Sequence, residues 1–353
     1  MNLYKTINLK FLNISILSLL FLSIMPLQAG KVDTLFVSDE IIKMELRSDF
    51  SAIQDERNDT PQYHKGELIY FTSGSEPVKL SVKVMARGNF RLKPVNCGFP
   101  PLFLNFRKNE VKNTIFADQD RLKLVTPCQN EEDVIDEYTI YKMYNQVTDL
   151  SLKVRLVNIV YFDTNLNKKL FEKHSFFIED KDHAAERNDA IEKDMVVTPF
   201  DLNRDNLIKL AFFQYIIGNK DWYISSRKNI TIMLPKDQSQ APSAVPFDFD
   251  FSALVNASYT KPHGIPEEFL AKRRIYKGIC YSDSELEDVF IFYKGLKPVF
   301  ESIIKSQKLI SAYNRRQILS YLDSFYEVIE DRDLIKKEFL EACETRATYN
   351  ISD

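Results

Sequence analysis

The chain has few of the residues on which several common kinds of enzyme site depend. It contains 353 residues, of which only 4 are histidine, 4 cysteine and 9 glycine. No cysteines follow the CxxC spacing of a zinc site, and neither the GxSxG motif of serine hydrolases nor the HExxH motif of zinc proteases is present. No glycine-rich segment follows a predicted strand. These absences argue against a zinc site, a serine hydrolase and a Rossmann-type cofactor site.

The chain also lacks an excess of basic residues, which argues against a nucleic-acid partner. The formal net charge is -3, with 44% hydrophobic and 27% charged residues, a composition typical of a globular protein. The sequence contains no internal repeat and no low-complexity tract. Its length predicts one large domain or two closely packed domains.

The N-terminus has the pattern of an export signal. Lys5 and Lys10 precede the apolar run "FLNISILSLLFLSIMPL", which is followed by a small residue, Ala29, at a cleavage-type position. Asparagine and serine interrupt this run, and it falls short of the ~20 residues that a membrane span needs. We therefore predict that residues 1–29 are a removed signal peptide. The mature protein would then be periplasmic or extracellular, with no stable membrane insertion.

Export changes the interpretation of the cysteines, because an oxidising compartment favours disulfides. The four cysteines are an even number, and their order suggests one local pair in each half, Cys97–Cys128 and Cys280–Cys343. Other connectivities, and buried free thiols, are the alternatives.

The predicted elements change along the chain from strands to helices. Residues 33–92 contain three runs rich in β-branched and apolar residues, and two short strand-like runs follow. Residues 133–150 have apolar residues at helical spacing, and two further strands come next. From about residue 184 the pattern is mainly helical and carries one strand pair. This order predicts an α+β protein.

Acidic side chains follow the most apolar predicted elements. The segment 201–218 begins with capping residues, is apolar on nearly every face and stops at Gly218, which predicts a buried helix. Asp221 and Asn229 follow in "GNKDWYISSRKN". The predicted strand pair comes next and ends in "VPFDFDFS", with Asp248 and Asp250. The hairpin would therefore return its two acids to the loop that holds Asp221.

These residue types suit phosphoryl transfer, which depends mainly on positioning and on charge neutralisation. Asp221 could orient an acceptor hydroxyl and take its proton. Asn229, Asp248 and Asp250 offer the hard oxygen ligands that magnesium prefers. The alternative is a helix stop at "GNKD" and a strand end whose acids face water.

The stretch "IIGNKDWYISSRKNITIML…AVPFDFDFSALV" resembles the atypical kinases of the CotH spore-coat type and, more distantly, HipA-like and lipid-kinase-like families. "MARGNFR" (85–91) is similar to the "RGN" element near the start of the CotH kinase core. "FFIED" (176–180) is similar to the strand that leads to the interlobe hinge, where adenine would bind. The chain also resembles exported bacterial proteins that share "CGFPPL", "LKLVTPC" and "FDFDFSALV". The resemblance covers about residues 83–255.

The resemblance implies a bilobal, atypical protein-kinase-like core. Its N-lobe would span residues 83–182 and its helical C-lobe residues 183–353, after a β-rich accessory region over residues 30–82. The chain departs from the family in having no glycine-rich loop. The spacing from Asp221 to Asn229 is also longer than usual.

The resemblance further implies a role for each site residue. Asp221 would be catalytic, and Asn229 and Asp248 would hold the metal, with Asp250 as a further ligand.

Cofactor contacts would come from the β-rich part and the central helix. The lysine that reaches the phosphates would be Lys123 or Lys83, with Glu137 on the central helix as its partner. Arg87 could hold phosphate with its planar guanidinium. Glu179 stands at the predicted adenine hinge.

The predicted function is phosphoryl transfer that depends on ATP and on Mg²⁺ or Mn²⁺, with an envelope or secreted protein or a glycan as acceptor. Three alternatives remain: a catalytically inactive kinase-like binding module of the envelope, a metal-dependent phosphate-ester hydrolase that uses Asp248 and Asp250, and a purely structural role. The basic segment "FLAKRRIYKG" (269–278) could receive an acidic substrate or phosphates, or be a solvated loop.

Overall fold

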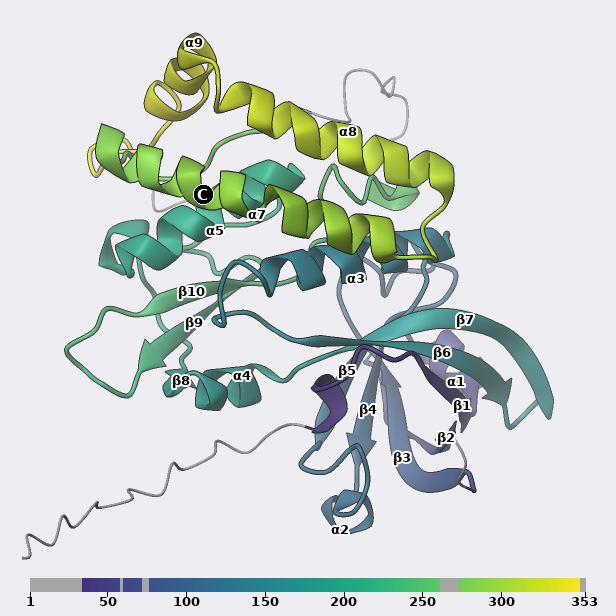
Figure 1. Ribbon diagram of the computed structural model, residues 1–353. Helices are drawn as coiled ribbons and strands as arrows, with labels where there is room; N and C mark the ends of the chain where they lie inside the picture. The colour runs from purple at the N-terminus through teal and green to yellow at the C-terminus, as the bar shows by residue number, and fades with distance from the viewer. Residues whose placement is uncertain (1–33, 58–59, 72–75, 261–272, 350–353) are drawn as a thin grey trace, which may run out of the picture. The chain divides into compact units, whose positions relative to one another are not determined.

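The computed structural model (Figure 1) contains a closed sheet of strands that is followed along the chain by a mainly helical part. The described residues are 34–57, 60–71, 76–260 and 273–349. The predicted signal peptide lies outside these ranges. No helix in the described part of the chain is long and apolar enough to cross a membrane.

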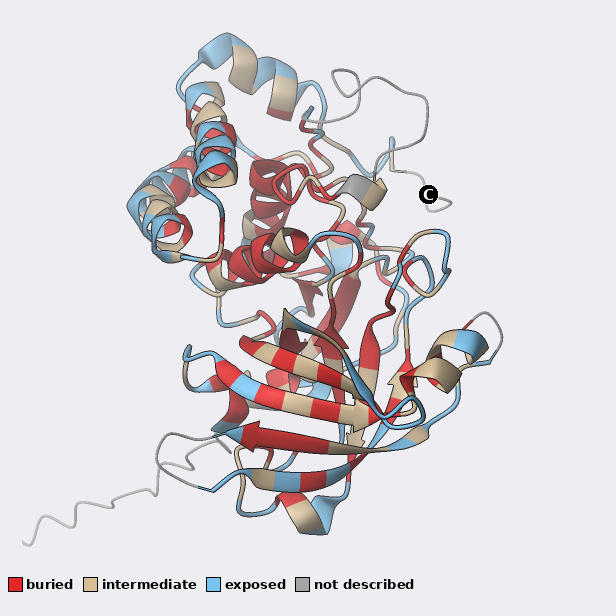
Figure 2. Ribbon diagram, turned by 90° about the vertical axis from the view of Figure 1, so that its right-hand side faces the viewer, coloured by how far each residue is buried: buried red, intermediate tan, exposed pale blue. Residues whose placement is uncertain are grey.

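Within these ranges, seven strands form one sheet that closes on itself. The strands are β1 (Ile42–Ser48), β2 (His64–Phe71), β3 (Val78–Ala86), β4 (Leu102–Phe106), β5 (Arg121–Val125), β6 (Val154–Asp163) and β7 (Lys168–Ile178). Their order round the sheet is β1-β2-β3-β4-β5-β7-β6, and the parallel pairing of β6 with β1 closes it. Buried residues alternate with less buried ones along β1, β3 and β4, which puts every second side chain of these strands into the interior, and Figure 2 shows such alternation on the sheet.

The boundary suggested between residues 82 and 83 falls inside β3, so residues 42–82 are not a separate accessory region. β1 pairs with β2 and with β6. The interior core of the sheet contains side chains from both sides of the boundary, among them Leu46, Val82 and Leu104. The sequence pattern predicts each strand of the closed sheet, but it contains no information about which strands pair, and pairing decides where a domain ends.

The chain beyond the closed sheet is mainly helical, as the sequence predicted. Its elements are α4 (Lys181–Arg187), β8 (Ala190–Glu192), α5 (Arg204–Ile217), β9 (Ile230–Pro235), β10 (Ser243–Pro246), α7 (Asp283–Ser306), α8 (Ala312–Val328) and α9 (Arg332–Ile335). The predicted strand pair is β9 and β10, and a third strand, β8, pairs with β9. β8 is too short to show a strand pattern in the sequence.

The central helix, α3 (Glu131–Tyr144), joins the two parts. It contacts β6 and β7 of the closed sheet on one side and α7 on the other. The Asn130 side chain caps its N-terminus by accepting from the Glu132 amide. Most residues of α3 are buried, and many of them belong to the large core of the helical part. A helix buried on all faces is held by its neighbours, so α3 fixes the closed sheet relative to the helices.

Both predicted disulfides are confirmed. Cys97 bonds Cys128 and Cys280 bonds Cys343, with Cα separations of 4.8 and 4.9 Å. The first ties the loop that follows β3 to the end of β5. The second ties the chain before α7 to the segment after α9. Disulfides of this kind are consistent with the predicted export.

The second disulfide should contribute more to stability than the first, because it closes the longer loop. We expect the double substitution Cys280→Ala with Cys343→Ala to lower the free energy of unfolding by about 4 kcal/mol in the chain-entropy model. Urea unfolding of oxidised protein measures this loss. Cys97→Ala with Cys128→Ala is the matched control, with a slightly smaller expected loss. An unchanged unfolding midpoint for the first variant would contradict the prediction.

Candidate functional site

A cleft of about 630 Å³ is lined by residues of both the closed sheet and the helical part. Its wall includes side chains that are far apart in the sequence and that the sequence predicts to share one site. These are Arg87, Lys123, Asp221, Asn229, Asp248 and Asp250.

The register of the sheet places Lys123 in this cleft. Leu122 and Leu124 point into the interior core of the sheet, so Lys123 between them points to the opposite face. Its β7 neighbour, Ile178, lies opposite it and also lines the cleft. Lys83, the alternative lysine, is exposed on β3 and does not line the cleft. Of the two lysines, only Lys123 is therefore placed to meet a ligand there.

Two arginines extend from the end of β3 into the cleft. Desolvation lowers the pKa of Arg87, while the nearby charge of Asp248 opposes this shift. Arg91 is only 9% exposed. Its guanidinium donates to the Thr126 carbonyl and lies 5.7 Å from the centre of the Tyr259 ring. Two planar cations on one wall suit an anionic ligand.

The loop that holds Asp221 is fixed by its own amide side chains. α5 ends at Gly218, whose φ of 65° turns the chain sharply. The Asn219 side chain then accepts from the Asp221 amide at 2.9 Å. Asn229 donates to the Asp221 backbone carbonyl at 2.8 Å and to its carboxylate Oδ2 at 3.1 Å, and Lys228 forms an ion pair with Oδ1. The Asp221 carboxylate is thus held in one orientation beside the cleft.

The hairpin returns Asp248 to this loop, as the sequence predicted. Just beyond the paired residues of β9 and β10, the Phe247 amide donates to the Asn229 carbonyl at 3.0 Å. The Asp248 amide donates to the Tyr141 hydroxyl of α3 at 2.8 Å. Asn229 and Asp248 have φ values of 55° and 65°, a left-handed conformation that Asn and Asp adopt more readily than most residues. The backbone conformation at both positions therefore favours Asn or Asp over most other residues.

Asp250, which lines the cleft, and Glu137, whose charge interacts with it, are buried carboxyls. Asp250 is 3% exposed, and the Tyr259 hydroxyl donates to its Oδ2 at 3.1 Å. No described group donates to its other oxygen, Oδ1. Burial, with repulsion from Asp248, raises the pKa of Asp250 to about 7. Burial, with repulsion from Asp250, also raises the pKa of Glu137 well above its ordinary value. These acids crowd together in a way that a bound cation would relieve.

Glu137 faces the arginines of the cleft. The cations whose charges act on it are Arg91 and Arg87. Burial, together with the positive charges of Arg87 and Lys181, lowers the pKa of Lys123 to about 8. The sequence suggested a lysine as the partner of Glu137; in the folded chain the positive charges that act most on its pKa are those of Arg91 and Arg87. The positive charges of Arg87 and Lys181 act more strongly on Lys123 than the carboxylates of Asp180 and Asp248 do.

This surplus of positive charge predicts that Lys123 lowers the stability of the ligand-free protein. Its pKa is lower in the folded state than in the unfolded state. The unfolded state therefore binds more protons between about pH 8 and about pH 10.5, and stability rises with pH across that window. We expect Lys123→Met to stabilise the protein at about pH 7 by at most about 3 kcal/mol and to remove this rise. Urea unfolding at about pH 7 and about pH 9.5 measures both effects. Lys83→Met is the control, and equal pH dependence in wild type and Lys123→Met would refute the prediction.

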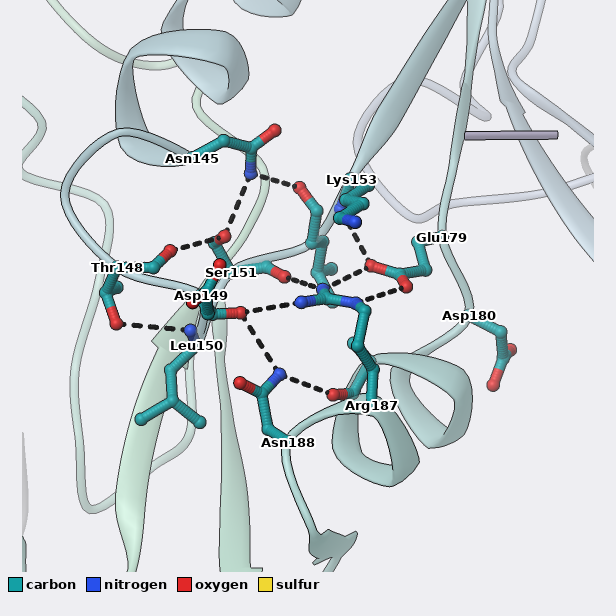
Figure 3. Close-up of polar contacts among 12 residues, drawn as sticks. Asn145, Thr148, Asp149, Leu150, Ser151, Lys153, Glu179, Asp180, Arg187 and Asn188 are labelled. Atoms are coloured by element: carbon teal, nitrogen blue, oxygen red, sulfur yellow. Dashed lines mark hydrogen bonds and ion pairs between the residues drawn. The ribbon is translucent and has the colours of Figure 1, made fainter. Parts of the chain in front are cut away.

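Glu179 lies beside the cleft but its carboxylate is used elsewhere (Figure 3). Arg187 of α4 donates to both of its oxygens, at 3.1 and 2.8 Å, and the Lys153 amide donates to Oε2 at 2.9 Å. The same guanidinium binds the carbonyls of Asp149 and Ser151. Glu179 follows a strand residue that faces the cleft, so its own side chain points the other way. It clamps the turn between the two parts and does not line the cleft.

Sequence reasoning missed several residues of the site. Arg91, Tyr141 and Tyr259 contact its acids or line its wall. The ammonium of Lys181 lies 4.1 Å from the centre of the Phe247 ring, which lines the same cleft. Arg91 is the last residue of the "MARGNFR" segment, but nothing in the sequence around it distinguishes it from a surface arginine. The other three reach the site only through the folded arrangement.

The donor set fits a divalent cation that is shared with a phosphate ligand. Among the residues that the structure describes, no three His, Cys, Asp or Glu side chains are grouped to hold a metal alone. Magnesium commonly takes one or two carboxylates and completes its shell with waters and phosphate oxygens. The exposed carboxylate of Asp248, the unpaired oxygen of Asp250 and the amide oxygen of Asn229 offer that incomplete set.

Comparison of the chain with models of known protein families found no match, and comparison with curated proteins found none either.

Proposed function

We propose that the protein is a phosphotransferase that depends on ATP and on Mg²⁺ or Mn²⁺ and acts on an envelope or secreted protein or on a glycan. The observation that carries this proposal is the composition of one cleft. Arg87 and Lys123 enter it from the closed sheet, while Asp221, Asn229 and Asp248 enter it from the helical part. Cations for phosphates, ligands for a metal and a carboxylate for an acceptor hydroxyl are thus within one site.

Phosphates would be held by the cations of the sheet. Arg87 and Arg91 offer planar guanidinium groups that can bind phosphate oxygens in pairs, and Lys123 adds a point charge. Val125 and Leu152 line the same cleft and offer an apolar surface for a base. Bound phosphates would also relieve the repulsion among these cations, so ligand and protein stabilise each other.

The metal would be held by Asn229, Asp248 and Asp250. When bound, it would supply positive charge that neutralises the phosphates and fixes their orientation. The chain's own contribution is to hold the ligands in place: the Tyr141 hydroxyl anchors the Asp248 amide, and Tyr259 anchors the Asp250 carboxylate.

Asp221 would orient the acceptor hydroxyl and receive its proton. The acceptor oxygen forms a bond to the γ-phosphorus, and the bond between that phosphorus and the bridging oxygen breaks. The electron pair leaves with the nucleoside diphosphate, and the proton passes to an Asp221 oxygen. Asn229 and Lys228 hold that carboxylate in position. The chemistry needs little beyond orientation and charge.

The arrangement of elements supports a kinase-like, bilobal assignment as part of this proposal. The closed sheet with α3 corresponds to an N-lobe, and the part from α4 onward corresponds to a C-lobe. The Glu179–Arg187 ion pair, whose carboxylate is 1% exposed, clamps the connection between them. Such a clamp would fix how far the two walls of the cleft stand apart.

A thermal-shift titration tests the proposal. Oxidised protein is titrated with ATP, ADP and GTP, with and without Mg²⁺ or Mn²⁺. At about a hundredfold excess over Kd, a ligand should stabilise the fold by about 2.7 kcal/mol and raise Tm. We expect Asp248→Asn to abolish the metal-dependent part of the shift. Asp237→Asn, an exposed acid in the hairpin loop, is the matched control and should behave as wild type.

Each other result has a definite meaning. No shift with any nucleotide, in a folded sample, would reject the proposal and favour the catalytically inactive binding module. Release of phosphate from simple esters without nucleotide would favour the hydrolase that uses Asp248 and Asp250. A bacterial periplasm holds little ATP, so an exported enzyme there would need another phosphate donor. The comparison of nucleotides therefore also indicates which donor the cleft accepts.

A further inference from the structure

Four cations lie around the Asp221 loop, and the proposed reaction uses only one of them. They are Lys220, Arg227, Lys228 and Lys277, here called the basic loop patch. The Lys277 ammonium donates to the Lys220 carbonyl at 2.5 Å. Lys277 belongs to the basic segment singled out in the sequence. Residues 269–272 of that segment lie outside the described residues.

A tight turn brings these cations together. The Tyr223 amide donates to the Lys228 carbonyl at 3.0 Å, and the two residues form an isolated bridge. The chain is thereby folded back on itself between Asp221 and Asn229. Arg227 and Lys228 line the cleft together with Asp221, so the patch begins at the candidate catalytic carboxylate.

The patch carries more positive than negative charge. Asp194 pairs with Arg227, and Asp221 pairs with Lys228. The ammonium of Lys277 contacts a carbonyl and a ring, and neither contact neutralises its charge. The chain as a whole has a net charge of -3, so this local positive surface is opposite in sign to the whole protein. Such a surface attracts acidic partners.

The chemistry of the patch favours a peptide over a saccharide. Sugar rings are commonly bound on an open aromatic face. The exposed aromatic residue of this loop is Tyr223, but Lys277 already lies 3.7 Å from the centre of its ring. Arg227 and Lys228 already pair with Asp194 and Asp221, so what remains for a ligand is the surplus charge of Lys220 and Lys277, which can pair with carboxylate side chains. Carboxylates spaced along an extended chain would match these two cations.

We propose that the basic loop patch binds an acidic segment of a protein acceptor, with aspartate or glutamate on either side of the hydroxyl residue that reaches Asp221. Its role in phosphorylation rests on the proposed function. The bond changes are those given above: the acceptor oxygen gains the phosphoryl group, Asp221 takes the proton and the nucleoside diphosphate leaves. The binding itself needs no catalysis, so it can be tested alone.

Fluorescence anisotropy measures this binding. The probes are a labelled serine peptide flanked by glutamates and the same peptide with glutamines or lysines in their place. We expect the acidic peptide to bind at least about tenfold more tightly than the neutral one, and more weakly as salt rises. Lys220→Glu with Lys277→Glu should lose at least about tenfold in affinity. The control, Lys108→Glu with Lys168→Glu, reverses two exposed charges outside the patch, one in the short helix after β4 and one at the start of β7, and should bind as wild type.

Equal binding of the acidic and neutral peptides would overturn the proposal, as would equal binding by the two reversal variants. Polygalacturonate, an acidic polysaccharide, is titrated in parallel, and tighter binding of it than of the peptide would also overturn the assignment. The nucleotide titration is run on the same sample. A nucleotide-dependent rise in Tm without preference for the acidic peptide would support the proposed function and reject the peptide site. Binding of the acidic peptide without a nucleotide-dependent rise in Tm would support the peptide site and reject the proposed function.

Discussion

Asp221→Asn should lower the rate of phosphoryl transfer by about 10²–10⁴-fold, the usual contribution of a positioned general base. Nucleotide binding should remain close to wild type. An amide cannot take the proton of the acceptor hydroxyl, but it keeps the size of the carboxylate and one accepting oxygen. That oxygen can still accept from the Asn229 side chain, so the loop should keep its conformation. The loss should therefore appear in kcat and not in the affinity for nucleotide.

Transfer of labelled phosphate to an acidic protein such as casein, together with the thermal-shift titration, separates these two effects. Asp194→Asn is the matched control, because Asp194 also pairs with a cation of the same loop but does not line the cleft. We expect Asp194→Asn to keep most of the activity. Wild-type rates in Asp221→Asn would show that this carboxylate is not the base. Loss of nucleotide binding in the same variant would show that it acts mainly in positioning the ligand.

The parts of the site that the sequence predicted are those set by local rules. The capping residues and glycine around α5 predict where the helix ends, and Asp221 follows directly. A hairpin returns its end to its beginning, so the proximity of Asp248 to Asn229 follows from strand pairing alone. The disulfides also obey a local rule, since each joins cysteines of one half of the chain.

The parts that the sequence did not predict depend on contacts between distant segments. Arg91 becomes a site residue because only β4 separates β3 from β5 in the closed sheet, so that its guanidinium, in the loop after β3, reaches a carbonyl at the end of β5. Glu179 is not part of the site because its carboxylate binds Arg187, which lies on a helix that the sequence pattern did not predict. The number of strands in the sheet could likewise not be predicted, because the sequence pattern of a strand is the same whether the strand with which it pairs is near or far along the chain.

The electrostatic interactions within the cleft also could not be predicted from the sequence, because they depend on how the chain folds. Glu137 is one of several acids along α3, and only the family resemblance, not the helix pattern, distinguishes it from the others. In the structure it is 2% exposed and close to Asp250 and Asp248, while Arg87 and Arg91 face it from the sheet. Opposite charges are thus concentrated at low exposure, where their mutual energies are larger than at the surface. Such a cleft is unfavourable when empty, and it is suited to a ligand that carries charges of both signs, such as a metal-bound phosphate chain.

Gly218→Ala should be the most damaging single methyl addition in this part of the molecule. Gly218 adopts φ of 65°, where a side chain costs roughly 1–2 kcal/mol. A Cβ there would lie 2.8 Å from the Ala253 Cβ and would overlap the Tyr321 hydroxyl of α8. Overpacking of this kind costs typically about 1–3 kcal/mol. We therefore expect the free energy of unfolding to fall by about 2–5 kcal/mol.

The effect should reach the site, because this glycine is the junction of its two acidic segments. The Ala253 amide donates to the Gly218 carbonyl at 3.2 Å, and Asn219 bridges Ser252. A shift at Gly218 would move the Asp221 loop relative to the segment that carries Asp250. Folded Gly218→Ala should therefore also bind metal and nucleotide less tightly than wild type in the thermal-shift assay.

A second substitution separates the overlap from the backbone strain. The Tyr321 hydroxyl is buried without a hydrogen-bond partner among the described residues, so Tyr321→Phe alone should cost little. In the Gly218→Ala background it should recover about 1–3 kcal/mol by removing the overlapping atom. Gly295→Ala is the control: a Cβ there meets nothing within 4 Å, and in α7 it should stabilise by about 0.5–1 kcal/mol. Urea unfolding of the four variants measures the coupling. Additive effects at 218 and 321 would mean that the hydroxyl does not restrict the glycine, and that the left-handed backbone alone demands it.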